Sequence, residues 1–322
     1  MNILLTGSIA FDYLMKFPGN FREHILPDKL ECLSLSFLVE SLVRQRGGIA
    51  PNIAYTLALL GQRPRLFATA GEDFAEYRLE LEQLGIDTSG VRIIPSEYTA
   101  TFFANVDREN AQIASFYPGA MAYAGELSLH DLGEPLPDLV LISPNDPRAM
   151  IRYPVECKSL GFPYIYDPSQ QIPRLTDDDL CQGLEGALAL FVNEYEFCMI
   201  QNRTGLSQEA LLAITQFAVV TNGAQGSSVY TGEKVHKIPA IRPERLVDPT
   251  GVGDAFRGGF LAGYANGWDL EICGQMGTIA ATYCLEQQGP QGHQFTPSEF
   301  MARFRQHFDD QGQLDGLILR RG

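Results

Sequence analysis

The sequence predicts an α/β fold: a doubly wound, mostly parallel sheet flanked by helices, with a small β-sheet lid beside it. Three observations predict this fold. Short apolar runs typical of buried strands recur along the chain, segments with helical periodicity separate many of them, and two longer stretches fit neither pattern. Strands that alternate with helices pair in parallel through right-handed crossovers. We therefore expect a single domain over residues 1–322.

The elements follow in order from the length and apolar spacing of each run. Short apolar runs predict buried strands at Ile3–Leu5, Arg65–Ala68, Leu139–Ile142, Tyr164–Tyr166, Leu188–Val192 and Ala218–Thr221. Apolar residues at helical spacing predict helices at Asn52–Leu60, Phe74–Leu84, Gln208–Gln216 and Pro297–Phe308. Between these last elements, a short β-rich run ends at Leu246 and Val247, and a helix is expected from Ala255.

The two stretches that fit no strand–helix unit show partly alternating apolar residues. They are Phe11–Val43 and Thr99–Tyr117, and they predict short strands outside the main sheet. We expect them to form a lid subdomain over roughly 11–45 and 97–120, since lids exclude water from reactive sites. Exposed aromatic side chains on a small sheet fit a dimer interface equally well, and both roles can coexist.

Composition narrows the function classes. Hydrophobic residues make up 45% and charged residues 20% of the 322 residues, as in an ordinary globular protein. The net charge of −15 argues against a surface for nucleic acid or an anionic membrane. The six cysteines are scattered without a C-x-x-C pair, which favours reduced thiols over a zinc site. Because there is also no apolar run of about 18 residues, we expect a cytoplasmic protein.

The segment Asp248–Phe256 carries the clearest chemical signal. Gly251 and Gly253 lie before an expected helix, where glycine lets backbone N–H groups approach a ligand closely. The helix N-terminus adds unpaired N–H donors and partial positive charge, which suit a phosphate. Asp254 would repel that phosphate unless it accepts a proton from an attacking hydroxyl. The segment therefore predicts phosphoryl transfer to an alcohol.

Other interpretations of this segment are weaker or excluded. A plain glycine-rich turn fits the two glycines alone, and Asp254 could simply favour the helix dipole. The chain contains no G-x-x-x-x-G-K-[ST], which excludes a P-loop NTPase. No G-x-G-x-x-G follows the first strand, which disfavours a dinucleotide fold. The absence of H-R-D and D-F-G excludes a protein kinase.

Four further polar motifs follow expected strand ends, where ligands bind in open parallel sheets. Paired glycines at 47–48 suggest close packing before Asn52, although Asn52 could simply cap a helix. Asp12 could accept hydrogen bonds from a sugar diol or be a solvated loop residue. Asn193–Glu196 fits an acidic helix start, and Thr221–Gly226 fits a hairpin turn. Each motif is weak alone, but together they lie where a doubly wound site would need them.

A resemblance to a known family joins these motifs. It is carried by the segments Thr6–Gly19, Leu33–Val39, Gln112–Met121, Asp167–Gln171 and Asp248–Arg257. The chain resembles the ribokinase-like (pfkB) family of carbohydrate and nucleoside kinases from Gly7 to about His293. Within that family it is most similar to bacterial adenosine kinases of the sugar-kinase-like type. Long runs such as Gln112–Met121 are far more specific than a glycine pattern.

The resemblance implies a role for each motif. Asp254 would be the catalytic base, and the backbone N–H groups of Gly251, Val252 and Gly253 would form the anion hole. The implied nucleoside-binding residues are Ser8, Asp12, Ser36, Gly48, Asn52, Phe102, Phe116, Gln170, Gln171 and Arg174. The implied ATP-binding residues are Asn193, Thr221, Asn222, Gly223, Ala224, Gln225 and Gly226, with Glu196 acting on Mg²⁺ through water. Independently, the flat face of a purine suits an aromatic partner such as Phe116.

Three positions depart from the family pattern without removing a catalytic group. Val252 replaces a small residue in the anion hole, Pro249 stands where threonine is common, and Pro51 precedes Asn52. Pro51 could tilt the turn that binds the sugar.

The implied reaction is the ATP-dependent phosphorylation of the adenosine 5′-hydroxyl, which yields AMP and ADP. Mg²⁺ would bridge the phosphates, a K⁺ requirement stays open, and the chain would form a homodimer through its lid. Two alternatives remain. One is a kinase of broader nucleoside or free-sugar specificity, and the other is a sensor that binds a nucleoside without reacting. Retention of Asp254 argues against the sensor, which has no use for a base beside phosphate.

Overall fold

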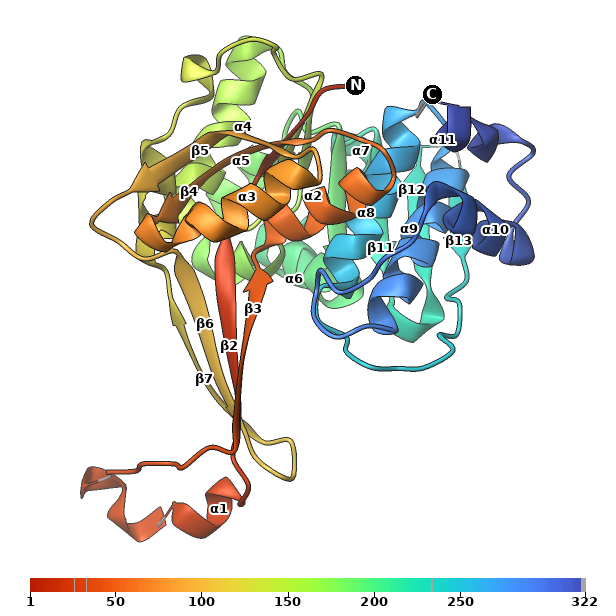
Figure 1. The fold of residues 1–322 in the computed structure, drawn as a ribbon. Coiled ribbons are helices and arrows are strands. Elements are labelled where there is room, and N and C mark those ends of the chain that lie inside the picture. The colour runs from red at the N-terminus through yellow and green to blue at the C-terminus, as the bar shows by residue number, and fades with distance from the viewer. Residues whose placement is uncertain (26, 33, 233, 320–322) are drawn as a thin grey trace.

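The structure is a computed structural model that describes residues 1–25, 27–32, 34–232 and 234–319. A large sheet carries helices on both faces, and a small sheet projects away from it (Figure 1). The predicted doubly wound α/β fold with a small β-sheet lid is therefore confirmed. No helix in the described ranges is long and apolar enough to span a bilayer.

The large sheet contains nine strands in the order β13-β12-β11-β10-β9-β8-β1-β4-β5. Their bounds are β1 Ile3–Thr6, β4 Arg65–Gly71, β5 Asp87–Ile94, β8 Leu139–Ile142, β9 Tyr164–Tyr166, β10 Ala189–Asn193, β11 Phe217–Thr221, β12 Ser227–Thr231 and β13 Val235–Ile238. All neighbours from β11 to β5 are parallel, whereas β12 and β13 pair antiparallel at one edge. From β1 the chain first adds β4 and β5 on one side of the sheet and later adds β8 to β11 on the other side. The point at which the strand order reverses therefore lies between β1 and β8. Ligands bind at such points, beyond the carboxyl ends of the strands.

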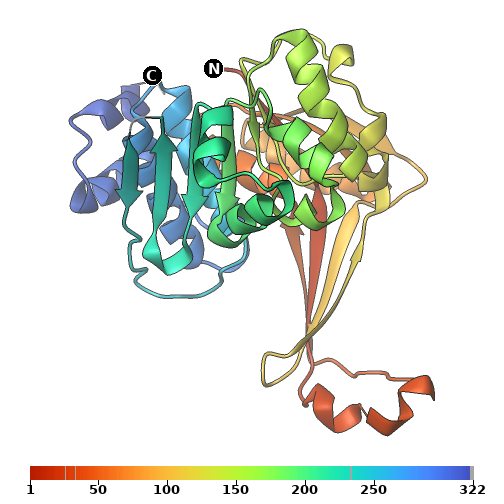
Figure 2. The same cartoon turned by 180° about the vertical axis from the view of Figure 1, so that it is seen from behind.

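Two layers of helices cover the sheet (Figure 2). One face packs against α2 (Ile49–Leu59), α3 (Ala75–Gln83), α8 (Val252–Ala265), α9 (Leu270–Leu285) and α10 (Pro297–His307). The other packs against α4 (Pro147–Leu160), α5 (Asp177–Leu184), α6 (Glu194–Thr204) and α7 (Gln208–Ile214). The short helix α11 (Gly316–Leu319) adds Leu317 to the first of these clusters. The short helix α1 (Phe21–His24) lies apart, at the far end of the small sheet (Figure 1).

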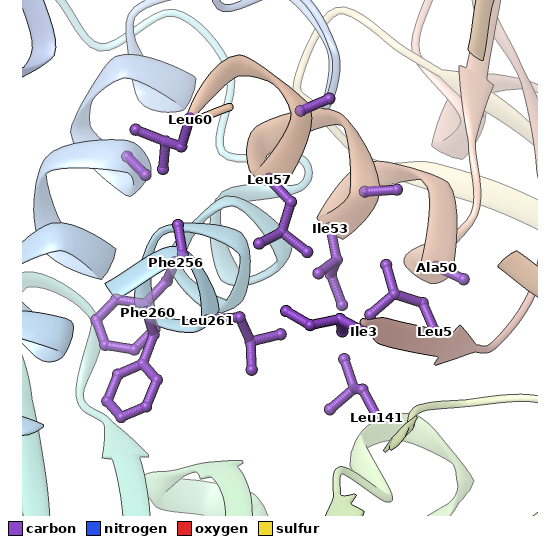
Figure 3. Packing of buried hydrophobic residues seen from close by; sticks show 14 of the residues in the cluster. Ile3, Leu5, Ala50, Ile53, Leu57, Leu60, Leu141, Phe256, Phe260 and Leu261 are labelled. Carbon is purple, nitrogen blue, oxygen red and sulfur yellow. The ribbon is translucent and has the colours of Figure 1, made fainter. Parts of the chain in front are cut away.

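The core holds the two helices of the candidate site firmly against the sheet. Ile53 and Leu57 of α2 face Leu5 of β1, and Phe260 and Leu261 of α8 lie beside them (Figure 3). All five side chains are fully buried. Burying each of them stabilises the fold by about 1.5–3 kcal/mol, so the first turns of α2 and α8 are anchored on a rigid base.

The small sheet contains four strands in the order β3-β2-β6-β7. Their bounds are β2 Ala10–Lys16, β3 Ser41–Gly47, β6 Ala100–Val106 and β7 Gln112–Tyr117. They come from the two stretches in which alternating apolar residues predicted strands outside the main sheet. Of the segment Leu33–Val39, residue 33 lies outside the described residues.

One predicted element is wrong. No strand ends at Leu246 and Val247, because both lie in an irregular segment between β13 and α8. Their side chains are 68% and 37% exposed, so neither belongs to a buried strand. The Val247 N–H instead donates to the Leu285 carbonyl (2.8 Å). The helix expected from Ala255 begins three residues earlier, at Val252.

Candidate active site

The glycine-rich loop before α8 is shaped by close packing against a second loop. Gly251 has φ +77°, a left-handed conformation that favours glycine, and a Cβ there would lie 2.3 Å from the Cβ of Pro290. The Val252 N–H makes a long hydrogen bond to the Pro249 carbonyl (3.4 Å). In the described part of the chain, the N–H groups of Gly251 and Gly253 have no such acceptor. This helix start therefore leaves N–H donors available, a feature that suits an anion.

Asp254 lies in the first turn of α8, at the floor of the same loop. Its carboxylate accepts a hydrogen bond from the side-chain amide of Asn52 (2.9 Å). Burial raises the pKa of Asp254 to about 7, against the lowering by Arg257 and by the hydrogen bond from Asn52. A carboxylate with that pKa is well suited to accept a proton near neutral pH.

The turn before α2 brings the predicted sugar-binding residues to Asp254. Gly48 has φ +94°, and a Cβ there would lie 2.5 Å from the Ser8 carbonyl oxygen. The Ser8 hydroxyl accepts from the Ile49 N–H (3.3 Å). Asn52 is 6% exposed, and its amide oxygen accepts from Gln291 (2.8 Å). The turn is thus held from several sides, and the Asn52 amide is oriented with its N–H₂ toward Asp254.

Asp12 enters the site from the small sheet. It stands in β2 with its carboxylate close to Gly47, where a Cβ would come within 2.7 Å. Burial, together with the charge of Asp248, raises the pKa of Asp12 to about 6. Asp12 also raises the pKa of Asp254, which places the two carboxylates in the same electrostatic environment.

Register places two aromatic side chains on the face of the lid that carries Asp12. Asp12 pairs with Phe102, which pairs with Phe116, so the three residues form one row across β2, β6 and β7. Partners in register project to the same side of a sheet. Phe116 is 48% exposed, and its ring is free for a ligand to cover. Phe103 projects to the opposite face, where it stacks on Tyr13 (5.2 Å between ring centroids).

Ser36 is not brought to the other predicted residues within one chain. It precedes Phe37, whose ring packs on Phe17 and Phe21 (4.9 and 5.0 Å between centroids) beyond the end of β2. This cluster lies at the tip of the lid, near α1 and far from the large sheet (Figure 1). Roughly 13 Å of strand separates that end of β2 from Asp12.

The segment after β9 supplies one wall of the site. Gln170 lines the cleft. Gln171 is only 8% exposed, and its amide oxygen has no hydrogen-bond partner among the described residues. Arg174 is exposed and is absent from the cleft lining.

The predicted donor-side residues lie at the ends of β10 and β11. Asn193 caps α6 in a capping box with Glu196, and Glu196 also accepts from the Ser169 hydroxyl (3.0 Å). Thr221 lines the cleft, and Gly226 (φ +95°) closes the turn to β12, where a Cβ would lie 2.0 Å from the Ile238 carbonyl oxygen. The turn contains Asn222, Gly223, Ala224 and Gln225. Asn222 and Gln225 also line a separate hollow against β12 and β13.

A cleft of about 270 Å³ gathers the glycine loop, Asp254 and, of the predicted donor-side residues, Asn193, Glu196 and Thr221. Its lining is Ile49, Pro144, Asp167, Ser169, Gln170, Asn193, Glu196, Thr221, Pro249, Gly251, Val252, Gly253, Asp254 and Arg257. No group of three or more His, Cys, Asp or Glu side chains in the described residues is arranged to hold a metal ion alone. The cleft thus joins a helix start with unused N–H donors to a carboxylate of raised pKa, an arrangement that suits phosphoryl transfer.

Sequence reasoning missed three side chains in or beside this cleft. Arg257 and Asp167 form a buried ion pair, and Gln291 donates to both Asn52 and the Tyr77 hydroxyl (2.8 and 2.5 Å). The position of Arg257 beside Asp254 could have been predicted from the sequence, since Arg257 follows Asp254 by about one helical turn. The roles of Asp167 and Gln291 could not have been predicted, because their hydrogen-bond partners lie 90 and 239 residues away in the chain.

Comparisons with known proteins agree with this geometry. The model of the pfkB family of carbohydrate kinases matches residues 26–296. The nucleoside kinase of Methanocaldococcus jannaschii is 30% identical over 95% of this chain and 97% of its own length. Its crystal structure, that of an archaeal member of the ribokinase family, superposes with a TM-score of 0.86 over 95% of this chain and 99% of that one.

Two further relatives are similar over most of their length. A cytidine kinase of Thermococcus kodakarensis is 30% identical over 77% of this chain and 90% of its own. The nucleoside kinase of Burkholderia thailandensis, in complex with ADP-inosine, is 36% identical with a TM-score of 0.83 over 95% and 96% of the two chains. The ribokinase-like fold and the family match agree, and the chain belongs to the pfkB family of carbohydrate kinases.

Proposed function

We propose that this protein is an ATP-dependent nucleoside kinase that phosphorylates the 5′-hydroxyl of adenosine. The observation that carries the proposal is Asp254, a carboxylate with a raised pKa beside the unpaired N–H groups of Gly251 and Gly253. A base and an anion hole on the same helix start serve the transfer of a phosphoryl group to a hydroxyl.

The chain's own groups account for each part of the step. Asp254 accepts the proton of the 5′-hydroxyl as that oxygen forms a bond to the γ-phosphorus. The bond from the γ-phosphorus to the β–γ bridging oxygen breaks, and ADP leaves with the electron pair. Backbone N–H groups at 251–253 oppose the negative charge on the transferred group. One such donor is worth about 2.7–4 kcal/mol in comparable sites.

The acceptor is proposed from the lid and from the relatives. Asp12 can accept hydrogen bonds from ribose hydroxyls, while Phe102 and Phe116 on the same face offer flat apolar partners for a base. The relatives are named as nucleoside or cytidine kinases, and one structure is a complex with ADP-inosine. Adenosine is our first choice because of the segments that resemble adenosine kinases, with inosine and cytidine as the alternatives.

The donor side fits a magnesium ion held mainly by phosphate oxygens. Both oxygens of Glu196 already accept hydrogen bonds, from Asn193 N–H (2.8 Å) and from Ser169 (3.0 Å), which suits contact through water better than direct ligation. When bound, Mg²⁺ would neutralise charge on the β- and γ-phosphates.

The lid is proposed to pair with the lid of a second copy. Its strands expose several large apolar side chains on both faces, among them Leu42 (59%), Phe103 (40%), Ile113 (44%) and Phe116 (48%). Such patches are typical of interaction surfaces. A partner's lid could also bring Ser36 into the opposite site.

Six free thiols and the use of ATP support the expected cytoplasmic location.

The proposal is tested by measuring ADP release with adenosine, inosine, cytidine, ribose and fructose, each with and without potassium. We expect adenosine to give the largest kcat/KM. Asp254→Asn should lower turnover by about 10²–10⁴-fold while adenosine still binds with nearly normal affinity in calorimetry. A strong preference for a free sugar would overturn the nucleoside proposal. Near-normal turnover of Asp254→Asn would remove Asp254 as the base, and binding without any ADP release would indicate a sensor.

A further inference from the structure

Arg257 stands at the reacting end of the cleft, although the proposed reaction gives it no role. It lies on α8 one turn after Asp254, so both side chains share a face of the helix. It lines the cleft together with Gly251, Gly253 and Asp254, yet it is only 8% exposed. A cation so poorly hydrated interacts more strongly with a nearby anion than a surface arginine does.

Asp167 fixes the orientation of this guanidinium. The Asp167 carboxylate, at the carboxyl end of β9, accepts from Nη2 of Arg257 (2.8 Å) and also from Nε. Nη1 of Arg257 donates to the Gly253 carbonyl (3.1 Å). Three of the five guanidinium N–H groups are thereby used within the described part of the chain, which leaves two. Burial alone would lower the pKa of Arg257, but Asp167 more than offsets this, so the pKa is raised and the charge is kept.

Contact with the anion hole is direct. A Cβ on Gly253 would lie 3.0 Å from Nη1 of Arg257. The guanidinium thus occupies space beside Gly253, a residue of the proposed anion hole. A purely structural ion pair has no need to lie against that loop.

The charge of the cleft also requires a cation. Its 14 lining residues include the three carboxylates Asp167, Glu196 and Asp254, and Arg257 is the one cation among them. The whole chain, with these residues included, carries a net charge of −15. An anionic phosphoryl donor in this cleft is therefore repelled by the carboxylates and attracted only by the N–H groups of the loop and by this guanidinium.

We propose that Arg257 is a further catalytic residue, which donates an N–H to a non-bridging oxygen of the transferred phosphoryl group, and that Asp167 is its positioning residue. The inference rests on the kinase function proposed above. As the γ-phosphorus leaves the ADP oxygen and bonds to the acceptor oxygen, with the proton going to Asp254, the guanidinium stays charged and opposes the charge on the group in transit.

The test compares Arg257→Gln, Asp167→Asn and the double variant, each assayed beside the wild type and Asp254→Asn. We expect Arg257→Gln to lower kcat by about 100- to 1,000-fold. Its affinities for ADP and for adenosine, measured by calorimetry, should stay within about threefold, because neither ligand contains the transferred group. Asp167→Asn keeps the cation and should lose much less activity. Arg257→Lys should recover part of the loss, since it restores charge without the planar fork.

The double variant Arg257→Gln/Asp167→Asn separates catalysis from folding. It replaces the buried ion pair by two amides of similar shape, so no unpaired carboxylate is left to unfold the protein. If Arg257 acts on the phosphoryl group, the double variant is folded in thermal melts and as slow as Arg257→Gln. Recovery of turnover in the double variant, or an equal loss of ADP affinity in Arg257→Gln, would overturn the proposal. If no acceptor in the panel raises ADP release by the wild type above the rate without acceptor, the proposed kinase function itself fails, which is distinct from a failure of the Arg257 variants alone.

Discussion

Asp254 shows at the scale of one residue how a catalytic demand conflicts with stability. Its pKa is raised to about 7 mainly by burial, from an ordinary value of 3.8. The same burial that suits the carboxylate to the proposed role of a base near neutral pH makes its charged form costly in the folded protein. Asn52 and Arg257 limit that cost without removing it.

A pH-dependent stability follows from this shift. Because the pKa of Asp254 is higher in the folded than in the unfolded chain, its contribution to stability is fully present below about pH 4 and is lost as the pH rises through 7. Asp254→Asn removes the titration. We therefore expect the variant to exceed the wild type in free energy of unfolding by about 1–3 kcal/mol at pH 8, with a smaller difference at pH 5. Urea unfolding at the two pH values measures this.

The matched control is Asp131→Asn, which removes an exposed carboxylate of the same kind. It should leave the difference between the two pH values unchanged. If Asp254→Asn is less stable than the wild type at pH 8, burial does not destabilise the charged carboxylate. The assignment of Asp254 as a base with a raised pKa would then be wrong.

Single residues also mark the limit of sequence-based prediction for the site. Asp254 and its glycines were identifiable because their spacing itself determines the chemistry. Arg257 and Asp167 bond across 90 residues, and no local pattern records that pairing. Ser36 stays a prediction, because the resemblance groups it with Asp12 while the lid places it away from Asp12 within one chain.

Elements were predicted best where burial sets the pattern. The strands Leu139–Ile142 and Tyr164–Tyr166 match the prediction to the residue, since fully buried strands of a parallel sheet are continuous apolar runs. Alternation in the lid likewise revealed strands outside the main sheet. The strand predicted to end at Leu246 and Val247 was wrong, because two apolar residues are enough to suggest a strand. Whether such residues are buried depends on tertiary contacts, which the local sequence does not record.

The lid also carries a prediction about assembly. Leu42 and Ile113 lie at opposite ends of one cross-strand row, through Met15 and Asn105, on the face away from Asp12. Both are exposed, at 59% and 44%. We expect the wild type to sediment as a dimer and Leu42→Glu/Ile113→Glu as a monomer, because the new charges would be buried without partners in a paired lid.

Leu136→Glu is the control for assembly, since Leu136 is 44% exposed but lies outside the lid. It should remain dimeric. A wild type that sediments as a monomer at micromolar concentration would contradict lid pairing. If the lid variant remains dimeric as well, the interface lies elsewhere on the surface.

For the whole molecule, the net charge of −15 sets how the two substrates arrive. A negatively charged protein repels anionic MgATP but not a neutral nucleoside, and salt screens that repulsion. When choline chloride is raised from about 10 to 150 mM at constant potassium, we expect kcat/KM for MgATP to rise about two- to threefold. The kcat/KM for adenosine should barely change.

Steady-state rates with each substrate varied in turn provide the measurement. A fall in kcat/KM for MgATP with added salt would show that local attraction at the anion hole and Arg257 outweighs the repulsion by the rest of the surface. Equal effects on both substrates would point to a change in the protein itself.

The proposed acceptor-binding row and the proposed base stand on different elements of the fold. The row consists of Asp12, Phe102 and Phe116, and the base is Asp254. The aromatic row stands on the small sheet, while Asp254 and the glycine loop stand at the start of α8 against the large sheet. If the row binds the acceptor as proposed, substitutions there should change which acceptor is preferred and leave the transfer step intact. A search for variants with a new acceptor should therefore begin by randomising the lid.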